Sequence, residues 1–294
     1  MKKFSNARIY RQHDEVSDIL VDKGVIKEIG KNLPKAGEEI DLRGRLVVPP
    51  YVDAHLHLDY VYTGRNTGAT NNTGTLFEGI ARWHDVKKTQ TFEDARERAL
   101  KGIREEVSKG VQFIRTHIDV DDPKLTGLKA MLEIREQLKD NVTIQIVAFP
   151  QEGMYAYKGG DEMVEEALKM GADCVGSIPH FEWAREIGEK SIHRTVELAV
   201  KHNKLIDVHC DETDDVMSRF VQLLNALVMA EGIGPRTAAS HTCSFGSADN
   251  AYAFRMLGLF QQSGMNFISL PTENAYLQGR QDSYPKRRGL TRVK

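Results

Sequence analysis

The stretch VVPPYVDAHLHLD, residues 47–59, decides how the fold of this chain is interpreted. An apolar run and a double proline lead into two histidines, His55 and His57, that are separated by one residue. In a β-strand, residues i and i+2 point to the same side, so both imidazoles would face one way. Two neutral imidazoles on one strand face are half of a metal site. The alternative is two polar residues on the solvent side of a half-buried strand.

The composition excludes some classes of partner. The 294 residues are 40% apolar and 28% charged, with a formal net charge of −2, which gives no reason to expect a nucleic acid or a membrane surface as a partner. No apolar run approaches the roughly 18 residues of a membrane span, and the first residues do not resemble a signal peptide. Three cysteines without a pairing pattern indicate a reducing compartment. We therefore expect a cytoplasmic protein.

The chain has two parts of different character. Residues 1–49 contain short apolar runs separated by turns, which is typical of a small β module that cannot stand alone. In residues 50–294, apolar runs that end in polar residues alternate with helical patterns, later at a spacing of roughly 30 residues. This alternation predicts βα units around a parallel sheet. Thr91 and Ser191 are expected to cap helices, and Gly171 to end one.

The polar residues that follow the apolar runs favour a barrel over an open sheet. An open, doubly wound sheet is the competing architecture, but no glycine-rich phosphate-binding fingerprint follows any of the runs. In a (β/α)8 barrel the carboxyl ends of the strands converge on the active site. The residues at or just past these ends are His55, His57, His117, Gln151, His180, His209, Glu212 and His241.

This set of side chains suits metal-assisted hydrolysis. Three imidazoles around an open position would hold a catalytic divalent ion, and a carboxylate that is not a ligand, such as Glu212, can carry protons. The Gln151 carboxamide matches the edge of a pyrimidine or amide-like ring, with a loop cap as the equal alternative. His117 and His180 are expected either in the wall of the site or against the substrate. The histidines expected at the surface are His13, His84, His193 and His202.

Several motifs occur in a fixed order between about residue 45 and the last residue: PPYVDAHLHLD, IRTHIDV, IVAFPQEG, LIDVHCDE and LQGRQDSYPKRRGLTRVK. In this order they resemble the bacterial cytosine deaminases of the amidohydrolase superfamily. The resemblance implies an α/β fold, a (β/α)8 TIM-like barrel with a small β-sandwich built from both chain ends. It also implies hydrolysis of cytosine to uracil and ammonia by a metal-activated water, a reaction of pyrimidine salvage.

The resemblance further implies roles for individual residues. The implied ligands of one divalent ion, Fe²⁺ or Zn²⁺, are His55, His57 and His209. Glu212 would move protons to the ring and to the leaving amine, His241 would polarise the water, and Gln151 would bind the pyrimidine edge. The expected partner is a small-molecule substrate, and a homo-oligomer is expected. The alternatives are a related aminohydrolase of isocytosine or creatinine and a catalytically inactive remnant.

The end of the chain departs from the family pattern. With about seven strand-like runs, the barrel of residues 50–294 is expected to be incomplete and to lack its eighth strand. The C-terminal part of the sandwich that residues 1–49 begin, and the family's metal-ligating aspartate, are expected to be missing with it, which leaves the activity of this chain an open question. Thr272 and Glu273 are expected in the loop after the last run, where an acidic residue could tune ring specificity.

Overall fold

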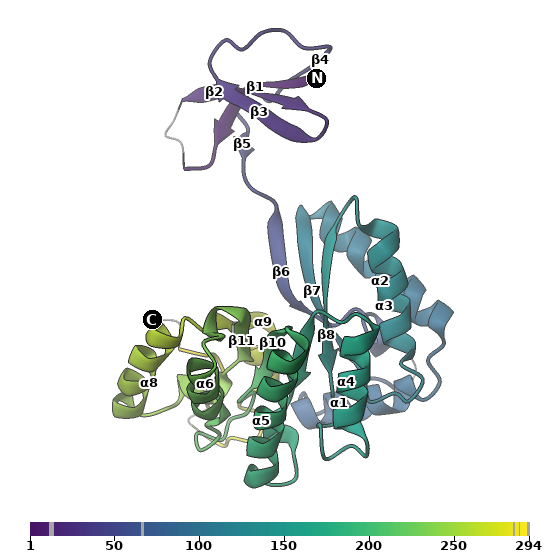
Figure 1. The fold of residues 1–294 in the computed structure, drawn as a ribbon, viewed down its shortest axis with the longest axis vertical. Helices are drawn as coiled ribbons and strands as arrows, with labels where there is room; N and C mark the ends of the chain where they lie inside the picture. The colour runs from purple at the N-terminus through teal and green to yellow at the C-terminus, as the bar shows by residue number, and fades with distance from the viewer. Residues whose placement is uncertain (12–14, 66–67, 285, 288, 293–294) are drawn as a thin grey trace. The chain divides into compact units, whose positions relative to one another are not determined.

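The structure is a computed structural model that describes residues 1–294 except 12–14, 66–67, 285, 288 and 293–294. It contains two compact units, Met1–Tyr51 and Val52–Lys294, and each is described by itself (Figure 1). Among the described residues, no helix combines the length and the apolar character that crossing a bilayer requires.

The N-terminal unit is a five-stranded sheet in the order β3-β2-β1-β4, with β5 also paired to β1. Lys23 and Gly24 join β2 to β3, and their φ angles of 49° and 79° suit a two-residue hairpin turn. The strands are β1 (Lys2–Ile9), β2 (Val16–Asp22), β3 (Val25–Gly30), β4 (Glu38–Asp41) and β5 (Leu46–Val47). This sheet confirms the small β module that the short apolar runs predict.

The second unit is built on a parallel sheet of seven strands that forms a nearly closed barrel. The strands lie in chain order from β6 to β12, so each one pairs with the strand before it. They are β6 (Tyr51–Leu56), β7 (Val111–Asp119), β8 (Thr143–Phe149), β9 (Cys174–Ser177), β10 (Leu205–Cys210), β11 (Thr237–His241) and β12 (Asn266–Ile268). The prediction of an incomplete α/β barrel with seven strands is confirmed for the described residues.

Helices connect these strands and cover the outer face of the barrel sheet (Figure 1). They are α1 (Leu76–Lys87), α2 (Phe92–Ser108), α3 (Thr126–Leu138), α4 (Gly160–Met170), α5 (Arg185–His202), α6 (Phe220–Ala230), α7 (Cys243–Gly246), α8 (Asn250–Ser263) and α9 (Pro271–Leu277). The core lies between the two layers, where Ile114 and Ile118 of β7 and Ile146 of β8 join Leu128 and Met131 of α3 in one buried cluster. Strands covered on their outer face in this way explain the near-continuous apolar runs.

The ends of the helices follow the sequence signals in part. Thr91 caps α2, because its hydroxyl accepts a hydrogen bond of 3.1 Å from the backbone N–H of Asp94. Gly171 ends α4 with a φ of 123°, a backbone conformation that suits glycine. The prediction that Ser191 caps a helix is wrong, because α5 begins at Arg185 and Ser191 lies inside it. Its hydroxyl instead donates to the carbonyl oxygen of Gly188, at 2.8 Å.

The segment after β12 is also different from the prediction. Thr272 and Glu273 lie in the first turn of α9, and not in a loop. Pro271 begins this helix, and proline is favoured at the first helical position because its fixed φ suits the helix and its missing N–H has no partner to lose there. The helix directs Glu273, Tyr276 and Leu277 into the lining of the cavity described below.

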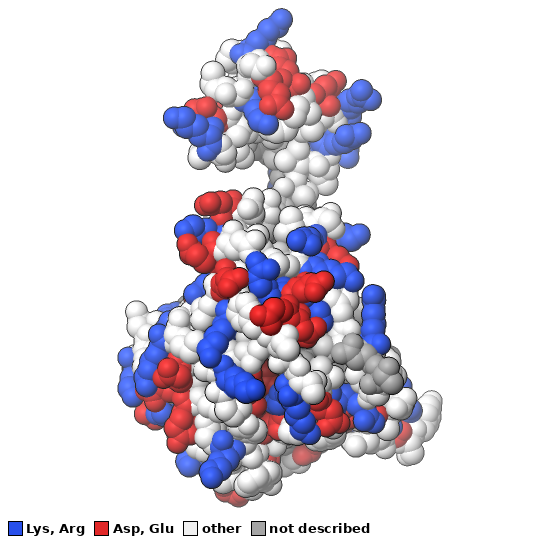
Figure 2. Space-filling view, turned by 90° about the vertical axis from the view of Figure 1, so that its right-hand side faces the viewer, with Lys and Arg blue, Asp and Glu red and all other residues white. Residues whose placement is uncertain are grey.

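The surface mixes both signs of charge. On the face that Figure 2 shows, Lys and Arg side chains alternate with Asp and Glu side chains. Some of these charges pair between helices, as in the contact of 2.7 Å between Arg96 of α2 and Glu133 of α3. Each such exposed pair contributes only about 0–1 kcal/mol to stability, so the packed core dominates the stability of the fold.

Candidate active site

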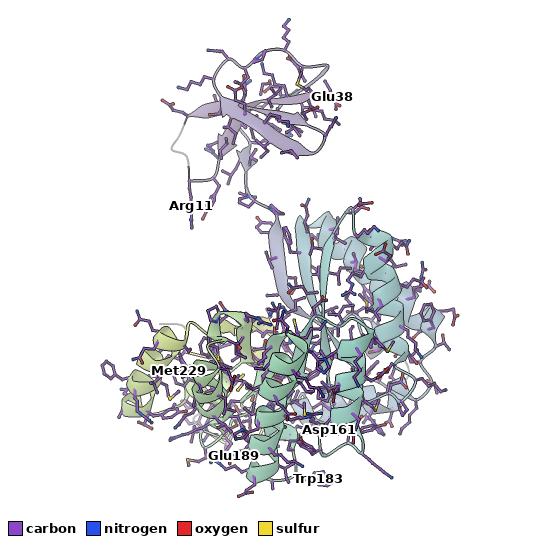
Figure 3. All side chains as sticks on the ribbon, in the orientation of Figure 1. Arg11, Glu38, Asp161, Trp183, Glu189 and Met229 are labelled. Atoms are coloured by element: carbon purple, nitrogen blue, oxygen red, sulfur yellow. The ribbon has the colours of Figure 1, made fainter. Side chains whose placement is uncertain are left out.

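All strands of the barrel sheet run in parallel, so their carboxyl ends gather at one end of the unit. Asp161 and Trp183, which follow β8 and β9 in the chain, lie toward this end in the lower part of Figure 3. A cavity of ≈ 270 Å³ lies among α1, α9 and the segments that follow β6, β8 and β10. The predicted site residues in its lining are His57, Gln151, His209 and Glu212.

Histidines from four different strands meet beside this cavity. His55 has the central position, with ring-centroid distances of 4.0 Å to His117, 4.6 Å to His209 and 4.7 Å to His241. His57, directly after β6, places its Nε2 atom 3.1 Å from Nε2 of His209. The fold therefore brings together imidazoles that are up to 186 positions apart in the chain, from His55 to His241, at the strand ends where the sequence pattern placed them.

The donor atoms in this cluster fit a divalent metal ion. One ring nitrogen of each histidine lies within 4.8 Å of those of the others in two groups: His55, His57 and His117 form one, and His55, His209 and His241 form the other. Two nitrogens that bind one ion tetrahedrally at about 2.0–2.1 Å lie roughly 3.3 Å apart, close to the 3.1 Å between His57 and His209. His55 Nε2 is buried and has no hydrogen-bond partner in the described part of the chain. These atoms suit Zn²⁺ and Fe²⁺ alike, because imidazole is a good ligand for both ions.

The protonation states of the histidines support the same interpretation. Burial, followed by the neighbouring imidazoles, lowers the pKa of His55, His57 and His209 well below the ordinary value for histidine. These rings are therefore neutral at pH 7, and neutral imidazole is the form that binds metal. Burial also lowers the pKa of His241 to about 3, so its ring is neutral as well.

A buried carboxyl group lies next to these imidazoles. Glu212 is 2% exposed, and its Oε1 atom is 3.2 Å from His241 Nδ1. Burial and the nearby Glu273 carboxylate raise the pKa of Glu212 well above its ordinary value. The Asn274 amide nitrogen links the pair, at 3.2 Å from Glu212 Oε1 and 3.0 Å from His241 Nδ1. A carboxyl group with a raised pKa can hold a proton near neutral pH and donate it.

Sequence reasoning missed Asn274. It is 1% exposed, on α9, and it contacts two of the predicted site residues. Asn274 comes six residues after Ile268, the last residue of β12, and this position near a strand end could have indicated a site residue. The segment was instead predicted to be a loop. Phe149, the last residue of β8, was also missed. Its ring stacks on His209 at a centroid distance of 3.9 Å and restricts the orientation of that imidazole.

The outer wall of the cavity is α1, which sequence reasoning did not connect to the site. Trp83 lines the cavity and donates a hydrogen bond of 2.6 Å from its indole N–H to Asp119 Oδ2, at the end of β7. Lys87, one turn later, reaches the same oxygen at 2.9 Å. The Trp83 contact is buried and the Lys87 contact is partly buried, so a hydrogen bond and an ion pair hold α1 against the barrel in addition to apolar packing.

The other predicted residues lie as follows. Gln151 is 5% exposed, after β8, and lines the cavity. His117 is fully buried, with its Nε2 atom 3.5 Å from Asp207 Oδ1. His180 lies in the short 3-10 helix Pro179–Phe181, and burial lowers its pKa to about 3. As expected, His193 is exposed, whereas His84 and His202 are only partly exposed. His13 lies outside the described residues.

Comparison with known proteins agrees with this geometry. The amidohydrolase family profile matches residues 38–294. The chain belongs to the amidohydrolase family. The resemblance inferred from the motifs is thereby confirmed at the level of the family, and a divalent metal site in the histidine cluster fits that membership.

Two curated relatives and one solved structure are similar over most of the chain. The crystal structure of 5-methylcytosine deaminase from Klebsiella pneumoniae, liganded with 5-fluorocytosine, is 46% identical, with a TM-score of 0.95 over 99% of this chain and 71% of that one. N-isopropylammelide isopropyl amidohydrolase of Pseudomonas sp. (strain ADP) is 29% identical over 88% of this chain. Pterin deaminase of Rhizobium rhizogenes is 27% identical over 94% of it. The chain spans 65% and 63% of the lengths of these two curated relatives.

Proposed function

We propose that this chain carries the active site of a metal-dependent aminohydrolase that converts cytosine, or a 5-substituted cytosine, to the corresponding uracil and ammonia. The convergence of His57, His209, Glu212 and Gln151 on one cavity is the observation that carries the proposal. It is supported by the 46% identity to a deaminase whose structure holds 5-fluorocytosine. We further propose that the protein acts in pyrimidine salvage, in the cytoplasm and as a homo-oligomer.

The proposed ligands of the ion are His55, His57 and His209. A divalent ion held there would lower the pKa of a coordinated water and so supply a nucleophile at neutral pH. The buried position of His209, at 3% exposed and stacked on Phe149, keeps its imidazole fixed for this role. His55 lies on β6, and His57 directly follows the last residue of that strand, Leu56, so one segment supplies both proposed ligands.

Glu212 and His241 would manage the protons of the reaction. Water adds to the ring carbon that bears the amino group, the bond from that carbon to nitrogen breaks, and ammonia leaves. Glu212, with its raised pKa, can give a proton to the ring nitrogen, take up the proton that the added water oxygen releases, and pass that proton to the leaving amine. His241 stays neutral and is oriented by Asn274, so it can accept or donate a hydrogen bond to the attacking water.

Another cyclic amidine is the second candidate substrate. Glu273 lines the cavity, and its carboxylate lies within 4.8 Å of the Glu212 carboxylate and of a His241 ring nitrogen. An additional acceptor at this place favours rings that carry a second N–H or amino donor, such as isocytosine or creatinine. The pterin deaminase relative shows that larger amino-substituted rings occur as substrates among similar proteins.

Ammonia release from a panel of substrates tests the proposal. The purified chain is loaded with Zn²⁺ or Fe²⁺ and incubated with cytosine, 5-methylcytosine, 5-fluorocytosine, isocytosine and creatinine. We expect the highest kcat/KM for cytosine or one of its 5-substituted forms. Activity on creatinine alone would remove the pyrimidine assignment. Little bound metal together with no turnover on any of these rings would favour the catalytically inactive alternative.

Replacing Gln151 with leucine should weaken binding of the pyrimidine. The change keeps the approximate size of the side chain but leaves the polar edge of the ring without a partner, a loss of about 1–3 kcal/mol, or roughly 5- to 150-fold in kcat/KM. Steady-state kinetics with cytosine measure the change, and Gln137→Leu on the exposed surface of α3 is the matched control. An unchanged kcat/KM in the Gln151→Leu variant would show that Gln151 caps the loop and does not bind the pyrimidine.

A further inference from the structure

We infer that a hydrogen-bonded chain of Arg115, Asp207 and Ser240 fixes the His55 imidazole in the tautomer that leaves its Nε2 atom free to bind the metal. The inference rests on the proposed metal site, and it names positioning residues that touch neither metal nor substrate. This series of hydrogen bonds crosses the interior of the barrel: it runs from Arg115 on β7 through Asp207 on β10 to Ser240 on β11, and it ends at His55 on β6.

The contacts of Asp207 define the first part of this chain. Asp207 lies on β10, with its side chain completely buried. Its Oδ2 atom is 2.8 Å from the Arg115 guanidinium, which also donates to Gln145 Oε1 at 3.0 Å. Its Oδ1 atom accepts a hydrogen bond of 2.7 Å from the Ser240 hydroxyl. Because arginine is always charged in proteins, this ion pair holds Asp207 as a carboxylate, which can only accept hydrogen bonds.

Counting hydrogens then determines the state of His55. The Ser240 hydroxyl has one hydrogen, and it is used in the bond to Asp207. Ser240 Oγ also lies 2.9 Å from His55 Nδ1, so the hydrogen of this second contact must come from the imidazole. A neutral imidazole carries only one N–H, and it is therefore on Nδ1. The lone pair remains on Nε2.

The free lone pair on His55 Nε2 connects this series of hydrogen bonds to metal binding. His55 Nε2 is buried without a hydrogen-bond partner among the described residues, and the His55 ring centroid lies 5.3 Å from that of His57 and 4.6 Å from that of His209. Histidines that bind metals generally donate their other N–H to an acceptor that fixes the ring, and loss of such an acceptor typically costs about 10- to 100-fold in metal affinity. The Ser240 hydroxyl is this acceptor for His55.

Zinc affinity of two variants tests the inference. In Ser240→Ala the acceptor is lost, and we expect affinity to fall by about 10- to 100-fold in a competition with a coloured chelator. Asp207→Asn keeps the size of the side chain, but its amide oxygen must face Arg115, so its NH₂ group would face Ser240. The serine would then donate to His55 Nδ1 and move the imidazole hydrogen to Nε2. We expect this variant to lose at least as much affinity as Ser240→Ala.

A control and a second readout separate positioning from folding. Ser177 is also a fully buried serine on a barrel strand, and its hydroxyl lacks a hydrogen-bond partner among the described residues. Ser177→Ala should therefore bind zinc with an affinity within about twofold of that of the unmodified protein, because the substitution removes no hydrogen bond. If the Ser240 or Asp207 variants do not fold, long-range ¹H–¹⁵N spectra of the unmodified, metal-free chain still report which nitrogen of His55 carries the hydrogen.

The outcomes distinguish this inference from the proposed function. Normal zinc affinity in Ser240→Ala, or an imidazole hydrogen on His55 Nε2 in the spectra, overturns the positioning role and leaves the metal site intact. If the unmodified chain binds zinc, and the variants bind it more weakly as expected, the inference stands even when none of the tested rings is deaminated. In that case only the substrate assignment fails.

Discussion

The His209→Ala variant will lose its bound metal and, with it, ammonia release. His209 faces His57 across 3.1 Å, is 3% exposed, and is held by the stacked ring of Phe149. Removing this imidazole leaves two of the three proposed ligands. Loss of a group that only hydrogen-bonds to a ligand typically lowers metal affinity by roughly 10- to 100-fold, and we expect a larger fall in zinc affinity here. Turnover should fall to the level of the metal-free protein.

The measurement is metal content after dialysis, combined with a chelator competition. His193→Ala is the matched control, because His193 is exposed on α5 and its loss should leave metal content and turnover unchanged. If His209→Ala retained one tightly bound ion per chain, the proposed set of ligands would be wrong, and His117 or His241, which contact His55, would be the next candidates.

The Glu212→Gln variant is expected to separate metal binding from chemistry. Glutamine keeps the size of the side chain and can still pair with Asn274, but it cannot take up and release a proton. Loss of general acid–base assistance typically lowers the rate by about 10²–10⁴-fold, so we expect kcat to fall by that amount with the metal content unchanged. Metal content and steady-state ammonia release from cytosine, measured on one preparation, provide both readouts.

Glu186→Gln, on the exposed first turn of α5, controls for the loss of a negative charge. A Glu212→Gln protein with full turnover would show that another group moves the protons. Glu273 would then be examined first, because burial raises its pKa to about 7 and its carboxylate lies close to that of Glu212. A variant that lost the metal as well would show instead that Glu212 acts in the metal site.

The rule that strand ends meet explains how much of the site was predictable. The histidines at the carboxyl ends of β6, β10 and β11 are far apart in the sequence, yet a parallel barrel in chain order must bring these strand ends together. Strand and helix alternation was enough to predict that arrangement, and it also indicated Glu212 and Gln151, each of which is the second residue after the end of a strand. These predictions needed no knowledge of side-chain contacts.

The residues that support the site were not predictable in the same way. Ser240 meets Asp207 across 33 positions, and this contact depends on the register between β10 and β11, which pairs His209 with Ser240. Ser240 meets His55 across 185 positions, from β11 to β6, which are not neighbours in the sheet. One residue of slippage would turn each side chain to the other face of the sheet. Asn274 depends on α9, which Pro271 starts where a loop was predicted.

Diffraction from crystals grown with Zn²⁺, measured at the zinc absorption edge, tests the central claim most directly. We expect one anomalous peak at the carboxyl end of the barrel, about 2.0–2.1 Å from ring nitrogens of His55, His57 and His209, with Nε2 as the ligand atom of His55. A peak bound elsewhere, or a histidine cluster without an ion in crystals that contain excess zinc, would contradict the assignment of a metal-dependent active site to this chain.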